Sequence, residues 1–115
     1  MNRLTDTEVL DFMKEDRDDV LYNIKGVYTA LENWNELEAS TETEAGGIKI
    51  MIQEAIDFDV EGMSYVVLYH RYLSPESPQA VEDVAKSLEM HRVSISRYTR
   101  LAVCRIYIYI NGWFF

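Results

Sequence analysis

The strongest constraint on the fold is the order of apolar and polar residues in the segment 84–98. Its first part places the apolar residues Val84 and Leu88 one helical turn apart. Its second part likewise places Ile95 and Tyr98 about one helical turn apart. The break between them, at residues 89–91, is long enough only for a tight turn. The segment therefore predicts two helices that cross at a three-residue turn.

The remaining residues of this region fit a helix-turn-helix over about residues 81–106. Ala85 supplies the small residue that two crossing helices need, and Met90 fills the turn. The second helix would bury one residue on each turn, at Ile95, Tyr98 and Leu101 or Ala102. Arginine can reach guanine edges or phosphates, and serine can donate to phosphates. We therefore expect double-stranded DNA as the partner, contacted by His91, Arg92, Ser94, Ser96, Arg97 and Arg100.

This motif resembles the helix-turn-helix of region four of bacterial sigma factors and of related phage-encoded regulators. Their pattern A-x-x-L-G-h-S-x-x-T-V-S-R is matched here by Ala85-x-x-Leu88-Glu89-Met90-His91-x-x-Ser94-Ile95-Ser96-Arg97. The organisation of the chain, with an acidic helical part before the motif, is similar to that of phage late-gene regulators of the ArpU type. The resemblance covers roughly residues 63–105. It implies a sequence-specific transcription regulator of phage or mobile-element type.

One residue of the motif departs from the family pattern. The turn position that the family usually fills with glycine is Glu89. This position commonly needs a positive φ, which costs a residue with a side chain about 1 kcal/mol. The sequence therefore predicts a left-handed, mildly strained Glu89 at the turn.

The N-terminal third has a heptad pattern that predicts one long helix over residues 5–37. Thr5 and Glu8 have the spacing of a capping box at its start. Such an apolar face needs a second surface to cover it. We expect a second copy of the chain, and thus a homodimer, or contact with RNA polymerase or another host protein; the alternative is packing within the chain. The face consists of Leu10, Met13, Val20, Ile24, Val27, Leu31 and Trp34, with Arg17 at one further position.

The rest of the chain completes an all-α prediction. We expect a long amphipathic helix within residues 1–38, a loop at 39–47 and a helical domain at 48–115 with helices over 48–58 and 63–73. The last helix should continue through Tyr107–Ile110, although Ile and Tyr alternate there as in a strand. Asn111 and Gly112 should end it, and the following Trp113 should fold back onto apolar surface.

Charge is distributed unevenly along the chain, whose formal net charge is −9. Residues 1–60 contain 15 acidic and 5 basic residues, whereas residues 61–115 contain 5 acidic and 6 basic residues. From residue 92 onward there are four arginines and no acid, which predicts a basic surface formed by Arg92, Arg97, Arg100 and Arg105. The alternative is that acidic helix faces simply keep the protein in solution.

The acidic half also supports a second hypothesis. In it, the chain is an acidic interaction protein that inhibits a host nucleic-acid-handling enzyme, and its helix-turn-helix serves as a scaffold or in autoregulation. Asp57, Asp59 and Glu61 lack the pattern of a calcium loop and are expected to cap the next helix.

Other functions find little support in the sequence. With His70, His91 and the single Cys104 we expect neither a metal site nor a catalytic group, and therefore no cofactor and no enzyme. No apolar stretch is long enough for a membrane span and no signal peptide is apparent, so we expect a cytoplasmic protein.

Overall fold

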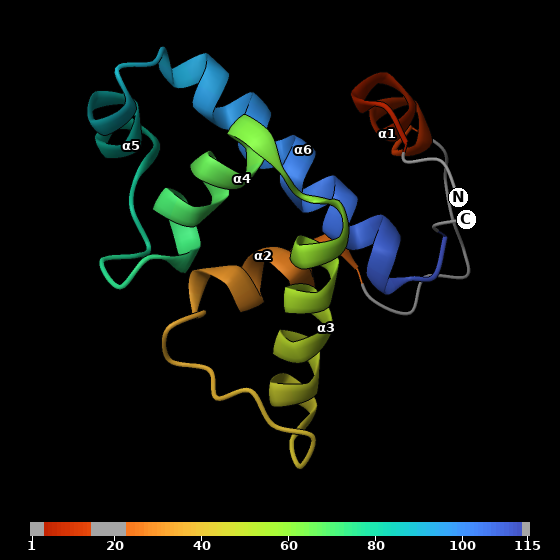
Figure 1. Cartoon of the computed structure of the whole chain (residues 1–115). Coiled ribbons are helices and arrows are strands. Elements are labelled where there is room, and N and C mark those ends of the chain that lie inside the picture. The colour runs from red at the N-terminus through yellow and green to blue at the C-terminus, as the bar shows by residue number, and fades with distance from the viewer. Residues whose placement is uncertain (1–3, 15–22, 114–115) are drawn as a thin grey trace.

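The computed structural model describes residues 4–14 and 23–113. Helices are the regular elements of this part of the chain, and Figure 1 shows their arrangement. In chain order they are α1 (Asp6–Phe12), α2 (Ile24–Glu32), α3 (Glu44–Asp59), α4 (Gly62–Leu68), the π-helical turn η1 (Tyr69–Leu73), α5 (Val81–Leu88) and α6 (Arg92–Ile110). The all-α prediction is therefore confirmed for the described residues.

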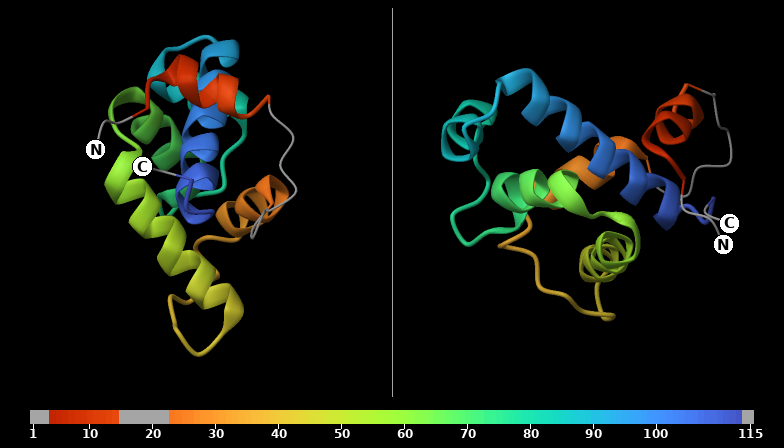
Figure 2. Two further views of the ribbon diagram at one scale, coloured as in Figure 1. Left: turned by 90° about the vertical axis from the view of Figure 1, so that its right-hand side faces the viewer. Right: turned by 45° about the horizontal axis from the view of Figure 1, so that its top comes forward.

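Helix α6 is the axis of the fold, because each of the other α-helices packs against it. In Figure 1 it runs diagonally, with α1 above it and α2, α3 and α4 below it. Figure 2 shows from a second direction that α1 and α3 lie on opposite sides of its C-terminal half. Every residue from 101 to 106 is buried, as expected for a helix surrounded on all sides.

The main hydrophobic core lies between α2, α3 and this second half of α6. It contains Val27 and Leu31 from α2, Ile52 and Ile56 from α3, and Ile106 from α6, among others. A smaller cluster beneath α1 joins Val9 to Cys104 and Ile108 of α6. The two halves of α6 therefore differ: the second is embedded in apolar neighbours, whereas the first is free to keep one face in solvent.

The prediction of one long N-terminal helix is wrong. Helix α1 ends at Phe12, and Asn23 has an extended backbone (φ −88°, ψ 160°) that no helix interior contains. The Asn23 side chain accepts a hydrogen bond from the Gly26 N–H at 2.7 Å, which is the geometry of a helix N-cap. The predicted capping box of Thr5 and Glu8 is present at the start of α1.

The heptad face joins residues that pack in different places. Val27, Leu31 and Trp34 are buried in the main core, and Ile24 packs against its edge. Helix α1 instead buries Val9, which is not a heptad position, and leaves Leu10 and Met13 half-buried. Val20 and Arg17 lie outside the described residues. The heptad spacing is therefore not the face of one helix, and the described heptad residues from Met13 onward pack within the chain.

Two other helices have bounds that differ from those predicted, and a third agrees with the prediction. Helix α3 begins at Glu44 rather than residue 48, because Thr43 caps it by accepting the Gly46 N–H at 3.0 Å. Residues 62–73 form α4 followed by the π-helical turn η1. Helix α6 continues through Ile110, as predicted, so the strand alternative for residues 107–110 is wrong.

The end of α6 agrees with the prediction in detail. Gly112 has φ 73°, and its N–H donates to the Tyr109 carbonyl at 3.0 Å. The Trp113 N–H donates to the Ile108 carbonyl at 3.1 Å, which completes a Schellman motif. Trp113 then folds back, and its ring packs 5.4 Å from that of Phe12 and 5.3 Å from that of Tyr107.

Candidate nucleic-acid interface

Helices α4, α5 and the first half of α6 share a third hydrophobic cluster. Its fully buried members are one residue from each helix: Val67, Val84 and Ile95. The partly buried residues around them are Val81, Ala85, Leu88, Met90 and Tyr98. The residues that the sequence assigns to the inside of the two-helix motif are therefore brought together, with Met90 of the turn among them. This packing fixes the direction in which the start of α6 points.

The turn between α5 and α6 consists of Glu89, Met90 and His91. Glu89 is left-handed, with φ 53° and ψ 44°, as predicted from its place in the motif. The Glu89 N–H donates to the Lys86 carbonyl at 3.3 Å and the Met90 N–H to the Ala85 carbonyl at 3.0 Å. These two bonds close α5 in the manner of a Schellman motif, although no glycine is present.

His91 begins α6 as its N-cap. Its backbone is extended, and its Nδ1 accepts a hydrogen bond from the Val93 N–H at 3.2 Å. The side chain is exposed. A cap at this position orients the first turn of α6 relative to the turn before it.

The outward face of this part of α6 is polar and mostly cationic, except for the exposed Val93. Of the residues predicted to contact DNA, His91, Arg92, Ser96, Arg97 and Arg100 are exposed, and Ser94 is half-buried. One face of the helix is formed by residues three or four positions apart. Val93 lies three and four residues before Ser96 and Arg97, which lie four and three residues before Arg100. We call the face formed by Val93, Ser96, Arg97 and Arg100 the α6 stripe.

The cations on and beside the α6 stripe have only loose internal contacts. The Arg92 Nη1 lies 3.9 Å from Glu82 Oε1, and both side chains are about two-thirds exposed (70% and 65%). An exposed pair of this kind contributes little to stability and is readily exchanged for another partner. The Arg97 guanidinium lies 5.7 Å from the centre of the Tyr98 ring, near the outer limit of a cation–π contact.

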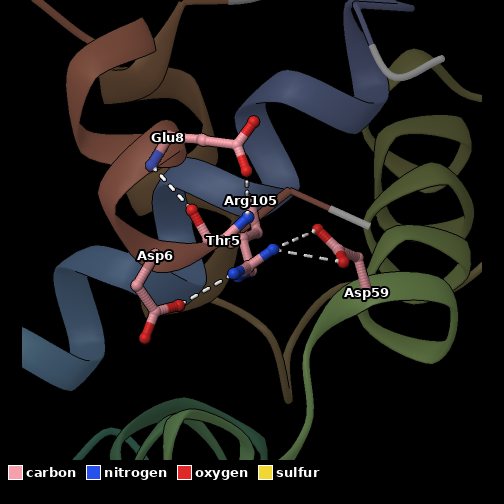
Figure 3. Close-up of polar contacts among 5 residues, drawn as sticks. All are labelled: Thr5, Asp6, Glu8, Asp59 and Arg105. Atoms are coloured by element: carbon pink, nitrogen blue, oxygen red, sulfur yellow. Dashed lines mark hydrogen bonds and ion pairs between the residues drawn. The ribbon is translucent and has the colours of Figure 1, made fainter. Parts of the chain in front are cut away.

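Arg105 is not part of this surface, so the prediction of a basic face of four arginines is wrong for this residue. Its side chain is 4% exposed and lies between α1 and α3 (Figure 3). Its Nη1 donates to the two carboxylate oxygens of Asp59, at 3.1 and 3.3 Å. Its Nη2 donates to Asp6 at 2.8 Å. The guanidinium therefore joins three helices in the interior.

The same contacts correct the role expected for Asp59. This residue ends α3, and its side chain is 1% exposed, so it does not cap the following helix from the surface. A buried guanidinium needs a buried or nearby carboxylate, because an unpaired charge in the interior is strongly unfavourable. Arg105 lies 46 residues from Asp59 and 99 residues from Asp6 in the sequence, so no local sequence pattern indicates this pairing.

Some further properties of the described residues bear on function. Burial raises the pKa of the Cys104 thiol above its ordinary 9.0, so this cysteine is a poor nucleophile. Over residues 4–14 and 23–113, no group of three or more His, Cys, Asp or Glu side chains is placed to hold a metal ion. No helix in those ranges has the length and apolarity needed to cross a membrane.

Comparison of the chain with protein-family models, with curated proteins and with solved structures finds no match. The α6 stripe is therefore interpreted from its own chemistry and geometry.

Proposed function

We propose that α5, the turn at residues 89–91 and α6 form a helix-turn-helix that binds double-stranded DNA. In this proposal the first half of α6 lies in the major groove, whose width admits one α-helix. The observation that carries the proposal is the amphipathic start of α6: Ile95 is fully buried against α4 and α5, whereas Arg97 and Arg100 face solvent on the opposite side.

Each side chain has a distinct role in this arrangement. Arg97 and Arg100 are long enough to donate to the O6 and N7 acceptors of guanine or to phosphates. Arg92 and His91 stand at the N-terminal end of α6, where contact with the phosphate backbone sets the position of the helix. Ser96 can donate to either, and the half-buried Ser94 is the least accessible of the predicted group.

We further propose that DNA binding serves sequence-specific regulation of transcription, in keeping with the resemblance to phage regulators. A homodimer would place two such helices in successive major grooves and would favour a two-fold symmetric site. Val27, Leu31 and Trp34 belong to the internal core, so our proposal does not assign them to a dimer interface.

The proposal is tested by fluorescence anisotropy with a pool of fluorescent duplexes that have a randomised centre. The chain is titrated at about 50 and about 200 mM salt, since phosphate contacts make affinity fall as salt rises. We expect binding that Arg97→Gln or Arg100→Gln weakens by about ten-fold or more, because a base-contacting arginine contributes about 1–3 kcal/mol.

The matched control is Lys14→Gln, which removes one positive charge from the turn after α1, where the Lys14 side chain is 78% exposed. An equal loss of affinity in Lys14→Gln and Arg97→Gln would mean that net charge alone matters. Failure of the unchanged chain to bind any duplex in the pool would refute the proposal.

One observation favours a second function, that of an acidic interaction protein. Among the described acidic residues of the first 60, all except Asp59 are exposed. They are therefore available to a basic protein surface, such as one that normally holds nucleic acid. This function predicts binding to a basic nucleic-acid enzyme that is unchanged by Arg97→Gln and Arg100→Gln. It is refuted if those substitutions abolish every interaction of the chain.

A further inference from the structure

Val93 is the most exposed large hydrophobic side chain of the described residues. Its side chain lies on the first turn of α6 and is 64% accessible to solvent. Phe58 and Tyr65 are also exposed, at 51% and 39%, but each has an aromatic neighbour, Tyr109 at 5.2 Å and Tyr69 at 6.3 Å between ring centres. Val93 thus stands out among the exposed apolar residues.

The packing of the chain does not account for a valine at this position. The hydrophobic clusters of the described residues do not include Val93. The interior contacts of this part of α6 are made by Ile95, Tyr98 and Ala102, which lie on the other side of the helix. Nor does helix formation favour valine, since a β-branched residue is a weaker helix former than alanine or lysine.

The position of Val93 connects it with the proposed DNA contacts. It lies three and four residues before Ser96 and Arg97, so the three share one face of the helix. Of the α6 stripe, Val93 is the residue nearest to the N-terminus of α6, the end that contacts base edges when such a helix enters the major groove. In the proposed complex the Val93 side chain would therefore face the bases, since it belongs to none of the hydrophobic clusters of the described residues.

The chemistry of the groove offers valine one partner. The base edges in the major groove present hydrogen-bond donors and acceptors, together with the C5-methyl group of thymine. A valine isopropyl group has neither a donor nor an acceptor, so it loses affinity against the polar edges and gains it against a methyl group. 5-Methylcytosine carries the same methyl group at the same ring position.

On the basis of the proposed DNA binding, we infer that Val93 determines specificity by packing against the C5-methyl group of a pyrimidine, which is thymine in unmodified DNA. The DNA site therefore has a thymine beside the base pairs contacted by Arg97 and Arg100. Removal of that single methyl group weakens binding roughly four-fold, the factor that corresponds to burial of one carbon group.

The test begins with selection of a preferred site from the randomised duplex pool by the unchanged chain. Each thymine of that site is then replaced, one at a time, by deoxyuridine, which removes only the methyl group. At the thymine that responds, two further duplexes carry cytosine or 5-methylcytosine. The dissociation constants of all duplexes are measured for the unchanged chain, for Val93→Ala and for the control Val66→Ala. Val66 is an exposed valine of α4, so its substitution removes the same atoms from another surface.

We expect the unchanged chain and Val66→Ala to prefer thymine over deoxyuridine roughly four-fold at one position, and Val93→Ala to bind both equally. 5-Methylcytosine should then be bound more tightly than cytosine by a similar factor. The ratio between the two bases isolates the methyl contact, because a general loss of helix stability lowers both affinities together.

Three results would overturn the inference. A selected site at which no thymine responds to loss of its methyl group would show that the chain binds DNA but does not contact that group. A preference that persists in Val93→Ala would assign the contact to another residue. Failure to select any site, although duplexes are bound, would refute sequence specificity and the inference with it, whereas failure to bind any duplex would refute the proposed DNA binding itself.

Discussion

Substitution of Asp59 by asparagine is the sharpest test of how α6 is held in place. The Asp59 carboxylate is 1% exposed and accepts two hydrogen bonds from Arg105, whose side chain is 4% exposed. Removing one partner of a buried ion pair costs about 3–5 kcal/mol, because the other charge stays buried without compensation. Here Arg105 keeps its 2.8 Å bond to Asp6, and asparagine keeps one accepting oxygen, so we expect about 3 kcal/mol, at the lower end of that range.

The comparison is Asp6→Asn, which removes the other carboxylate of Arg105. The Asp6 side chain is 62% exposed, and water therefore replaces most of what it provides. We expect a loss of no more than about 1 kcal/mol from this substitution. The buried Asp59 carboxylate is thus predicted to contribute several times more to the free energy of unfolding than the exposed Asp6 carboxylate, although both bind Arg105.

Urea and thermal unfolding, followed by circular dichroism, measure both variants. For a chain of this size about 3 kcal/mol lowers Tm by about 12 °C, so Asp59→Asn should remain folded at 25 °C but melt far earlier. A double variant, Arg105→Met with Asp59→Leu, should be more stable than Arg105→Met alone, because it leaves no unpaired charge inside. Equal losses in Asp59→Asn and Asp6→Asn would refute the reasoning.

Three further predictions follow from single features of the structure. Glu89→Gly should raise the free energy of unfolding by about 1 kcal/mol in urea titrations, because glycine adopts the φ of 53° without strain; a decrease would contradict this. Gly46→Ala should destabilise the chain by about 1–3 kcal/mol, since its Cβ would lie 2.6 and 2.8 Å from two backbone carbonyl oxygens, and wild-type stability would disprove it. Burial raises the pKa of Cys104 above 9.0 and those of Tyr28 and Tyr72 above 10.0. The unfolded chain therefore ionises first, and stability should be unaffected by these groups below about pH 9 and fall above it; a flat profile to pH 11 would count against it.

The sequence predicts the C-terminal half well because the relevant interactions there are local. The spacing of Val84, Leu88 and Ile95 lies within two neighbouring helices, and it alone identifies the residues that meet inside the motif. The left-handed Glu89 and Gly112 follow in the same way, since helix ends are closed by bonds between residues at most five apart. Val93 shows the limit of this reasoning: it lies in the middle of the predicted contact residues, yet its apolar side chain gave no reason to include it.

The N-terminal half is predicted poorly because its structure depends on distant contacts. A heptad pattern records which residues avoid water but not which surface covers them. Met13 and Val27 therefore belong to one apolar series in the sequence but pack in two different clusters in the structure. Arg105 is a similar case. In the sequence it follows three other arginines and is predicted to share their basic surface, whereas in the structure it is buried against Asp59 and Asp6.

The acidic charge of the chain sets a condition on the proposed DNA binding. Helix α5 and the first turns of α6 lie on one side of the molecule, whereas α1 and α3 lie toward the other (Figures 1 and 2). The molecule extends 38 Å along its longest axis, while charges in water are screened beyond about 8 Å at physiological salt. Under those conditions DNA near the α6 stripe encounters Arg97 and Arg100 and little of the distant acidic charge.

That screening weakens as salt is removed, so the salt dependence of binding should be unusual. At about 0.01 M salt the screening length is about 30 Å, close to the size of the whole molecule, and the net charge of −9 then repels DNA as well. We expect the logarithm of the binding constant to rise as salt falls toward about 0.05 M and then to flatten or reverse, where counterion release alone would give a straight line. Anisotropy titrations over this range measure the curvature, and Glu54→Gln with Asp57→Gln on α3 should reduce it. A straight line down to the lowest salt would show that the acidic half has no electrostatic influence on the α6 stripe.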